Sequence, residues 1–504
     1  MNFFKQYKLD ILALASASAC YFMLRMYHIL TLPIFTDEAI YTRWAQIAKQ
    51  DTAQRFISLT DGKQPLFIWF AAVLMRFIHD PLLAARMVSV LAGFATMIGL
   101  YFLGKEIFKN RKIGLLSAVF YLFSPFGLVY DKMALYDSLV GTFAVWGLFI
   151  SILLVRKVRL DVSFILGLVV GIGMLNKTNA ESTLILLPFN LLLFDWRKKE
   201  RTKRLLLWVC YAGLAAVLAY TYYSILRLSP LFYMVAQKNT TFLYPLHEWL
   251  QHPFTFFIGN MHGLLDWFFT YTTIPIVVMV AVSFFISRFF WREKILLLLW
   301  FVIPLVYAAL FGKVLYPRYI LFMILPLLPL AAYTLYWLAS RLKNTVVVIV
   351  CFFIILFPAF YADYFILNDF AKAPIPKSDL RQYSNDWPAG GGVKETIGVL
   401  KAKAANGKIY VVTEGTFGLM PYALEIYLVN DKNVKIQGLW PISETPPKEL
   451  ISINKKIPVY AVFYQPCPSC INGKAPIGWP VTEIAKYRKG DSSIYLYLYQ
   501  FTAH

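Results

Sequence analysis

The chain has 504 residues, of which 59% are apolar and only 15% charged, a composition too hydrophobic for a soluble multidomain protein. Apolar runs of about 18 or more residues recur along most of its length and predict a polytopic α-helical membrane protein. The net charge of +21 does not indicate nucleic acid, because the densest basic clusters lie in short links between apolar runs, as the positive-inside rule expects of cytoplasmic loops.

The first predicted span covers residues 11–30 and follows a basic start, which places the N-terminus in the cytoplasm. No small-residue cleavage site follows this run, so we interpret it as a retained anchor and not as a signal peptide. A large outer loop, residues 31–81, comes next. It ends in an apolar piece at 65–78 that is short for a crossing and fits an interfacial or re-entrant helix. Later spans are predicted near 82–103, 113–129, 138–155, 162–175, 182–195, 205–225, 268–287, 295–311, 318–338 and 345–366.

This arrangement gives about eleven spans in the plasma membrane and an extracytoplasmic C-terminus. If residues 65–78 do not cross, the basic links at 105–112, 156–161, 195–204, 287–294 and 340–344 all lie in the cytoplasm. Charges close to a membrane tend to line cavities or carry function, although scattered loop charges in water are the alternative interpretation. The same alternation of inner and outer links places a set of polar residues at or near the outer face: Asp37, Glu38, Lys63, Asp131, Asp137, Lys177, His247 and Arg318.

The composition changes after the last span. Residues 1–367 form the predicted membrane domain, and residues 368–504 alternate strand-like runs (KIYVVT, NVKIQG, PVYAVFY, SIYLYLYQF) with helix-like ones. This pattern predicts a small extracytoplasmic α/β domain. The Pro-, Gly-, Asp- and Ser-rich residues 368–392 are its linker.

Two adjacent carboxylates, Asp37 and Glu38, begin a helical pattern in the outer loop. An acid at a helix start can simply be a cap, and position alone favours that interpretation. A positioned carboxylate can also take a proton from an attacking hydroxyl. The cap interpretation leaves two adjacent carboxylates at the membrane surface unexplained.

The loop segments TDEAIYTRWA and GKQPLFIWF resemble the first extracytoplasmic loop of the GT-C superfamily. Within it, the chain resembles the protein O-mannosyltransferase and aminoarabinose-transferase-like family, glycosyltransferase family 39. Further matching segments follow in the same order over residues 10–340. They are LLAARMVSVLAG with Arg86, YDKMALYDS with Asp131 and Asp137, GIGMLNKTNAESTLILLP with Lys177, and YPRYILFMILPLLPL with Tyr316, Arg318 and Tyr319.

The resemblance implies a sugar donor on a polyprenyl monophosphate, such as undecaprenyl or dolichyl phosphate. It also implies inverting transfer of a hexose or pentose to a hydroxyl on a protein, glycan or lipid, among membrane lipids. In the mannosyltransferase branch, the aspartate matching Asp37 is the proposed base, and the next glutamate, here Glu38, is also functional. A phosphate leaving group needs no general acid where cations meet its developing charge. The expected donor-phosphate ligands are Lys63, Lys177, Arg318 and Tyr319, with snorkelling at a helix end as the alternative for Lys177 and Arg318.

Asp131, Asp137 and Arg43 are the expected contacts to the rest of the substrate. Asp131 and Asp137 lie across a short outer turn, where they orient the sugar or the loop, with a structural hydrogen-bonding role as the alternative. The chain departs from the aminoarabinose-transferase branch at Gly62, where that branch has a glutamate before the loop lysine. This departure weakens any metal or acceptor contact carried over from that branch, and divalent-metal dependence stays open.

Other signals are weaker. His247, Glu248, His252 and His262 match no zinc spacing and fit the membrane interface better. Cys467 and Cys470 form a CxxC that fits a disulfide, a metal half-site or two thiols. Residues 413–416 sit at a strand-to-helix turn, which a helix cap explains and where acceptor recognition is the alternative.

Two other functions compete with sugar transfer. A transporter or flippase of lipid-linked sugars would use the same cations, but it favours charges near the bilayer midplane and repeated broken helices. A non-catalytic scaffold leaves the carboxylate and cation set unexplained. The sequence therefore predicts a membrane glycosyltransferase acting at the outer face, with Asp37 as general base.

Overall fold

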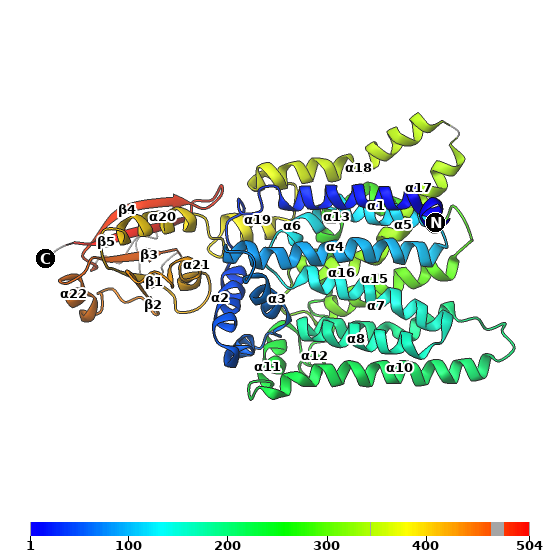
Figure 1. Ribbon diagram of the computed structural model, residues 1–504, viewed down its shortest axis with the longest axis horizontal. Helices are drawn as coiled ribbons and strands as arrows, with labels where there is room; N and C mark the ends of the chain where they lie inside the picture. The colour runs from blue at the N-terminus through cyan, green and yellow to red at the C-terminus, as the bar shows by residue number, and fades with distance from the viewer. Residues whose placement is uncertain (1, 343, 465–477, 503–504) are drawn as a thin grey trace.

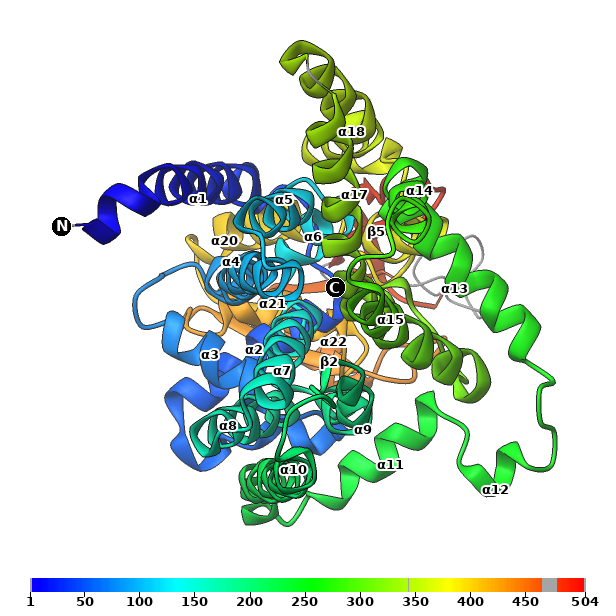
Figure 2. The same cartoon turned by 90° about the vertical axis from the view of Figure 1, so that its right-hand side faces the viewer.

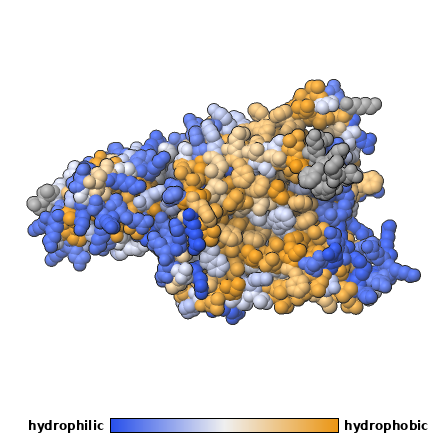
Figure 3. Space-filling model, viewed as in Figure 1, coloured by the Kyte–Doolittle hydropathy of each residue, from blue (hydrophilic) through white to orange (hydrophobic). Residues whose placement is uncertain are grey.

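The computed structural model describes residues 2–342, 344–464 and 478–502, and Cys467 and Cys470 lie outside these ranges. A bundle of helices forms one body, and a smaller sheet-containing domain stands at one end of it (Figure 1). The N-terminus lies at the opposite end of the bundle. A hydrophobic belt covers the bundle, whereas the surface of the C-terminal domain is mostly hydrophilic (Figure 3). This arrangement confirms the predicted polytopic helical fold with a C-terminal α/β domain.

Six helices of the described residues are long and apolar enough to cross a membrane, or up to eight if each bent pair forms one crossing. The six are α4 (Pro81–Phe108), α7 (Asp137–Lys157), α10 with its following 3-10 turn (Arg201–Leu228), α15 (Trp291–Phe311), the run through α16 (Leu321–Ile324) and α17 (Leu328–Arg341) that begins at Pro317, and α18 (Thr345–Asn368).

The remaining predicted spans correspond to bent or shorter helices. The bent pairs are α5 (Arg111–Leu122) with α6 (Pro125–Asp131) and α13 (Phe257–Thr272) with α14 (Ile274–Ser283). α1 (Asn2–Met26) contributes the apolar stretch Ile11–Met26, and α8 (Leu160–Asn176) is an apolar helix of 17 residues. The span predicted at 182–195 is instead α9 (Ser182–Leu186) and a 3-10 helix, Leu187–Leu193, because Pro188 interrupts the run.

Short helices gather at the end of the bundle that carries the C-terminal domain (Figure 1). They are α2 (Thr36–Gln50), the 3-10 turn Ile57–Asp61, α3 (Leu66–Leu74), α11 (Tyr233–Phe242), α12 (Leu246–Trp249) and α19 (Lys377–Leu380). At nine residues, α3 is too short to cross a bilayer. The chain then turns into α4, where Asp80 caps the helix by accepting a hydrogen bond from the Leu83 amide at 2.8 Å.

Ion pairs connect the basic links at the other end of the bundle. Arg156, in the last turn of α7, pairs with Glu106 of α4 at 2.8 Å and with Glu293 of α15 at 3.1 Å. Arg204, near the start of α10, donates to the carbonyl of Arg156. The links between these helices therefore share one end of the bundle, as the charge pattern predicts.

The C-terminal domain is a five-stranded sheet of order β2-β1-β3-β5-β4. Its strands are β1 (Ile409–Glu414), β2 (Val434–Leu439), β3 (Val459–Phe463), β4 (Val481–Arg488) and β5 (Tyr495–Phe501). β1 pairs in parallel with β2 and β3, and β5 runs antiparallel to β3 and β4. α20 (Val393–Ala404) and α21 (Leu419–Leu428) pack on one face, and α22 (Lys448–Asn454) packs on the other.

The two bodies share buried side chains where they meet. Phe370, Ile375 and Tyr383 come from the linker but belong to the hydrophobic core of the bundle. Ile34 and Leu82 come from the bundle but pack with the core of the C-terminal domain. The predicted domain boundary at 367/368 thus falls at the last residue of α18, just before a linker that is anchored on the helices.

Candidate functional site

Asp37 lies in the first turn of α2, at the end of the bundle that faces the C-terminal domain. The chain before it is held by an antiparallel bridge between Phe35 and Ala389. The Asp37 side chain is 19% exposed, and its carboxylate contacts Arg318 at 3.2 Å and Lys63 at 3.8 Å. Three segments far apart in the sequence therefore meet at one partly exposed carboxylate.

Glu38 points the other way and is fully buried. Arg86 of α4 donates to both of its oxygens at 2.8 Å, and the amides of Ala134 and Phe35 donate to one oxygen each at 2.7 and 3.0 Å. Arg86 also donates to the carbonyls of Ile29 and Leu32. Each Glu38 oxygen accepts two hydrogen bonds, so Glu38 fixes the start of α2, and its contacts favour a positioning role over the predicted catalytic one.

Lys63 stands on the turn after the 3-10 helix Ile57–Asp61. Its ammonium donates to the Tyr41 hydroxyl and lies 4.8 Å from the centroid of the Tyr41 ring. The residue before it, Gly62, has a φ of +66°, and a Cβ there would lie 2.3 Å from the Met234 carbonyl of α11. The glutamate that the related branch carries before its lysine therefore cannot be accommodated here.

Arg318 follows Pro317 at the start of the run that leads into α17. Besides Asp37, its guanidinium reaches the hydroxyl of Tyr383 at 3.4 Å and the side-chain oxygen of Gln382 at 3.5 Å. Its central carbon lies 4.6 Å from the centroid of the Tyr316 ring. Aromatic rings and the linker thus fix the guanidinium in one orientation while its side chain keeps 9% exposure.

Lys177 begins the turn after α8 and pairs with Asp137 at 3.1 Å. Its ammonium lies 4.6 Å from the centroid of the Tyr319 ring, which itself lies beside Arg318. The Lys177 side chain is 28% exposed, and that of Asp137 is 6% exposed. The predicted phosphate ligands Lys63, Lys177, Arg318 and Tyr319 are therefore brought together around two carboxylates.

The net charge of this group is positive, because its four cations outnumber its three carboxylates: Lys63, Lys177, Lys238 and Arg318 against Asp37, Asp61 and Asp137. Burial acts to raise the pKa of Asp37, but the charges of Lys63, Arg318, Lys177 and Lys238 outweigh it and leave that pKa below its usual value. Burial lowers the pKa of Lys63, against the opposing effect of Asp37 and Asp61. Asp37 is ionised at neutral pH, and the group can receive an anion.

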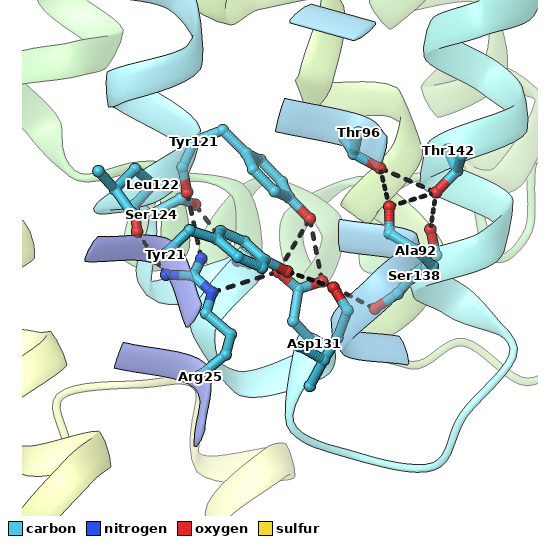
Figure 4. A network of polar contacts seen from close by, with 12 residues as sticks. Tyr21, Arg25, Ala92, Thr96, Tyr121, Leu122, Ser124, Asp131, Ser138 and Thr142 are labelled. Carbon is cyan, nitrogen blue, oxygen red and sulfur yellow. Dashed lines mark hydrogen bonds and ion pairs between the residues drawn. The ribbon is translucent and has the colours of Figure 1, made fainter. Parts of the chain in front are cut away.

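Asp131 is not part of this group. It is completely buried between α1, α4 and α5, where Tyr21, Tyr121 and Ser138 donate to its carboxylate and Arg25 pairs with it at 3.4 Å (Figure 4). No face of the carboxylate is open to a sugar. We therefore correct the predicted substrate contact of Asp131 to the structural role that was its alternative.

Arg43 also takes a different place from the one predicted. It pairs at 2.7 Å with Glu425 of α21, so it joins α2 to the C-terminal domain. Trp44 packs against Phe417 in the loop before α21, with ring centroids 6.1 Å apart. The predicted substrate contact of Arg43 is replaced by an interdomain ion pair.

Two sets of polar residues were not predicted. Lys238 of α11 pairs with Asp61 at 2.6 Å and so adds a fourth cation near Asp37. Asp379 is fully buried and close enough to Arg318 to interact with its charge, and the hydroxyls of Tyr130 and Tyr271 donate to one of its oxygens. Lys238 and Asp379 lie outside the matching segments, so the sequence pattern gave no signal for either.

No group of three or more histidine, cysteine, aspartate or glutamate side chains within the described ranges could hold a metal ion. His247 and Glu248 belong to α12, and Glu248 pairs with Lys313 at 2.7 Å. Glu248 therefore belongs to an ion pair with Lys313 just after α15, and in the part of the chain that the structure describes this pair is not bonded to Asp37.

A profile of the family described as dolichyl-phosphate-mannose-protein mannosyltransferase matches residues 62–223. A search of curated proteins found no significant match.

Solved structures share the fold over nearly the whole chain. ArnT from Cupriavidus metallidurans bound to undecaprenyl phosphate superposes with a TM-score of 0.60 at 16% identity, covering 99% of this chain and 98% of that chain. The apo oligosaccharyltransferase from Archaeoglobus fulgidus gives 0.52 at 13% identity, covering 92% and 70%. The predicted resemblance to GT-C glycosyltransferases is thus confirmed, and at these identities it is a likeness of fold.

Proposed function

We propose that this protein is a membrane glycosyltransferase that transfers a sugar from a polyprenyl-phosphate donor to a hydroxyl acceptor, with inversion and with Asp37 as the general base. The observation that carries the proposal is the partly exposed Asp37 carboxylate between Arg318 and Lys63, with Lys177 close by. The family profile and the undecaprenyl phosphate in the ArnT structure support the donor class.

The cations act on the leaving group. As the bond between the sugar's anomeric carbon and the phosphate oxygen breaks, negative charge grows on that phosphate. Arg318 offers a planar fork, and Lys63 and Lys177 offer point charges, all of which stabilise the charge without a proton. The donor phosphate leaves as an anion that these side chains hold.

Asp37 acts on the nucleophile. The acceptor hydroxyl attacks the anomeric carbon from the side opposite to the phosphate, a new carbon–oxygen bond forms, and the hydroxyl proton passes to the Asp37 carboxylate. One displacement of this kind inverts the configuration. Glu38 and Arg86 hold the first turn of α2, and so hold Asp37 in place.

Donor binding also tunes the base. In the free protein the nearby cations keep the pKa of Asp37 low, which makes its carboxylate a weak base. A bound phosphate offsets these positive charges and therefore raises the pKa of Asp37. Asp37 becomes a stronger base only when the donor is present.

We further propose that the site faces the outside of the cell and that the N-terminus lies in the cytoplasm. The support is that the basic links share the other end of the bundle, which the positive-inside rule assigns to the cytoplasm. Acceptor and donor would then meet beneath the C-terminal domain, whose α21 is paired to α2 through Arg43 and Glu425.

The variant Asp37→Asn tests the proposal. It keeps the size of the side chain but cannot take the proton, so transfer of labelled sugar from a polyprenyl-phosphate donor should fall by about 10²–10⁴-fold with little change in the unfolding midpoint. Asp51→Asn is the matched control, because Asp51 is an exposed carboxylate at the end of the same helix. Wild-type transfer by D37N would remove Asp37 from the reaction, and movement of the donor across the membrane without transfer would indicate a flippase.

A further inference from the structure

We propose that a cavity at the opposite end of the bundle binds the phosphate headgroup of an anionic membrane lipid. The cavity has a volume of about 620 Å³ and lies between the link from α14 to α15 and the last turns of α17. This end of the bundle faces the viewer in Figure 2, where α14, α15 and α17 lie together. Its lining includes the polar or amphipathic residues Ser287, Arg288, Tyr333, Trp337, Ser340 and Arg341, and Ile286 and Phe289 complete it.

The charge of the lining calls for an anion. Arg288 and Arg341 face the same cavity, its lining contains no acidic residue, and neither arginine has a carboxylate within 4.0 Å in the described part of the chain. Arg156 at the same end differs, because Glu106 and Glu293 both pair with it. Two guanidinium groups on one cavity repel each other unless an anion lies between them. A phosphate has the acceptor geometry that such forks bind.

The wall of the cavity is built from fixed side chains. Lys294 of α15 is fully buried and donates to the carbonyls of Ser283 and Ser287 at 2.6 and 2.7 Å. Its ammonium also lies 4.5 Å from the centroid of the Tyr333 ring. These contacts hold the link that carries Arg288 against α17, so the two arginines are kept on one cavity.

The surroundings favour a lipid over free phosphate. Phe285 and Phe289 of the same link are 87% and 78% exposed, which is unfavourable unless acyl chains cover them. Trp337 packs within 5.2 Å of the Arg341 guanidinium and is the type of residue that sits at headgroup level. Basic pockets between transmembrane helices are typical binding sites for anionic headgroups. The proposal does not depend on the proposed sugar transfer.

The experiment uses the full-length protein in nanodiscs of phosphatidylcholine with and without phosphatidylglycerol, and it measures retained lipid by native mass spectrometry and the unfolding midpoint. Arg288→Ala with Arg341→Ala removes both forks. Arg197→Ala with Arg201→Ala is the matched control, because these exposed arginines precede and begin α10 at the same end and do not line the cavity.

Phosphatidylglycerol should bind the wild type and the control variant and raise their unfolding midpoints relative to phosphatidylcholine. Affinity should fall about fivefold for each lining arginine removed, or about thirtyfold for the pair. Replacement of both by lysine should give an intermediate loss, because the charge remains but the fork does not. An equal loss in the control variant would make the effect one of general surface charge and would overturn the proposal. Retention by the alanine variant, or the same stabilisation by inorganic phosphate in phosphatidylcholine, would overturn it too.

Discussion

Replacing Glu38 with glutamine separates a positioning role from a catalytic one. Each Glu38 oxygen accepts one bond from Arg86 and one from a backbone amide. In E38Q the side-chain NH2 must replace one of the two oxygens, so a donor would face the two donors that this oxygen now accepts from. The buried Arg86 also loses its paired carboxylate. Breaking a buried ion pair in this way costs about 3–5 kcal/mol. That is a large part of the roughly 5–15 kcal/mol that stabilises a folded protein.

The assay is unfolding of the full-length protein in detergent, monitored by heat or by SDS titration, together with sugar transfer. Asp161→Asn is the control, because Asp161 pairs with Arg159 on the surface with side chains 55% and 62% exposed. Such a pair contributes about 0–1 kcal/mol. We expect E38Q to lose stability and transfer together. An E38Q protein that unfolds like the wild type but transfers no sugar would refute the positioning role and place Glu38 in the reaction.

Three further outcomes follow from the charges and the backbone. Lys63→Met removes the charge that lowers the pKa of Asp37 most, so the acid limb of the pH profile of kcat/KM should move to higher pH. An acid limb that does not move would show that Lys63 does not control the pKa of Asp37. Burial raises the pKa of Asp379 to about 6, above its unfolded value, so its contribution to stability is present below about pH 4 and is lost as pH rises through 6. The difference in unfolding free energy between wild type and Asp379→Asn should therefore change by up to about 3 kcal/mol across that window. A difference that stays constant with pH would contradict the raised pKa of Asp379. Gly62→Ala puts a Cβ 2.3 Å from a backbone carbonyl at a φ of +66°, so limited proteolysis should cut the first outer loop faster than in Gly213→Ala, whose Cβ meets nothing within 4 Å.

The hydrophobic pattern was sufficient to predict the bundle, because lipid-facing and core-facing apolar residues make long runs that can be read in any sequence. It also predicted four of the five strands, which are apolar runs. β4 was missed because it is an edge strand whose side chains are mostly exposed, so VTEIAKYR shows no apolar run. α22, with only Leu450 buried, was missed for the same reason.

The candidate site divides in the same way. Asp37, Lys63, Lys177 and Arg318 were predicted together from charge sidedness and from the family resemblance, and the fold brings them together. Asp131 came from the same argument but is buried. A charged residue near the outer face of a helix can point into the site or into the core, and one residue of helical rotation decides between them.

The sequence by itself determined that this is a polytopic helical membrane protein with a C-terminal α/β domain, and it predicted that Asp37, Lys63, Lys177 and Arg318 lie at one end of the bundle, because these features depend on local composition and charge counts. Only the tertiary structure decided what each charge contacts. Arg43 pairs with Glu425, which lies 382 positions away. Lys238 pairs with Asp61 and packs against Gly62, and Asp379 accepts hydrogen bonds from Tyr130 and Tyr271. Such partners depend on how the helices pack in space. Packing brings together residues that are far apart in the chain, and their positions in the sequence do not indicate that they will be in contact.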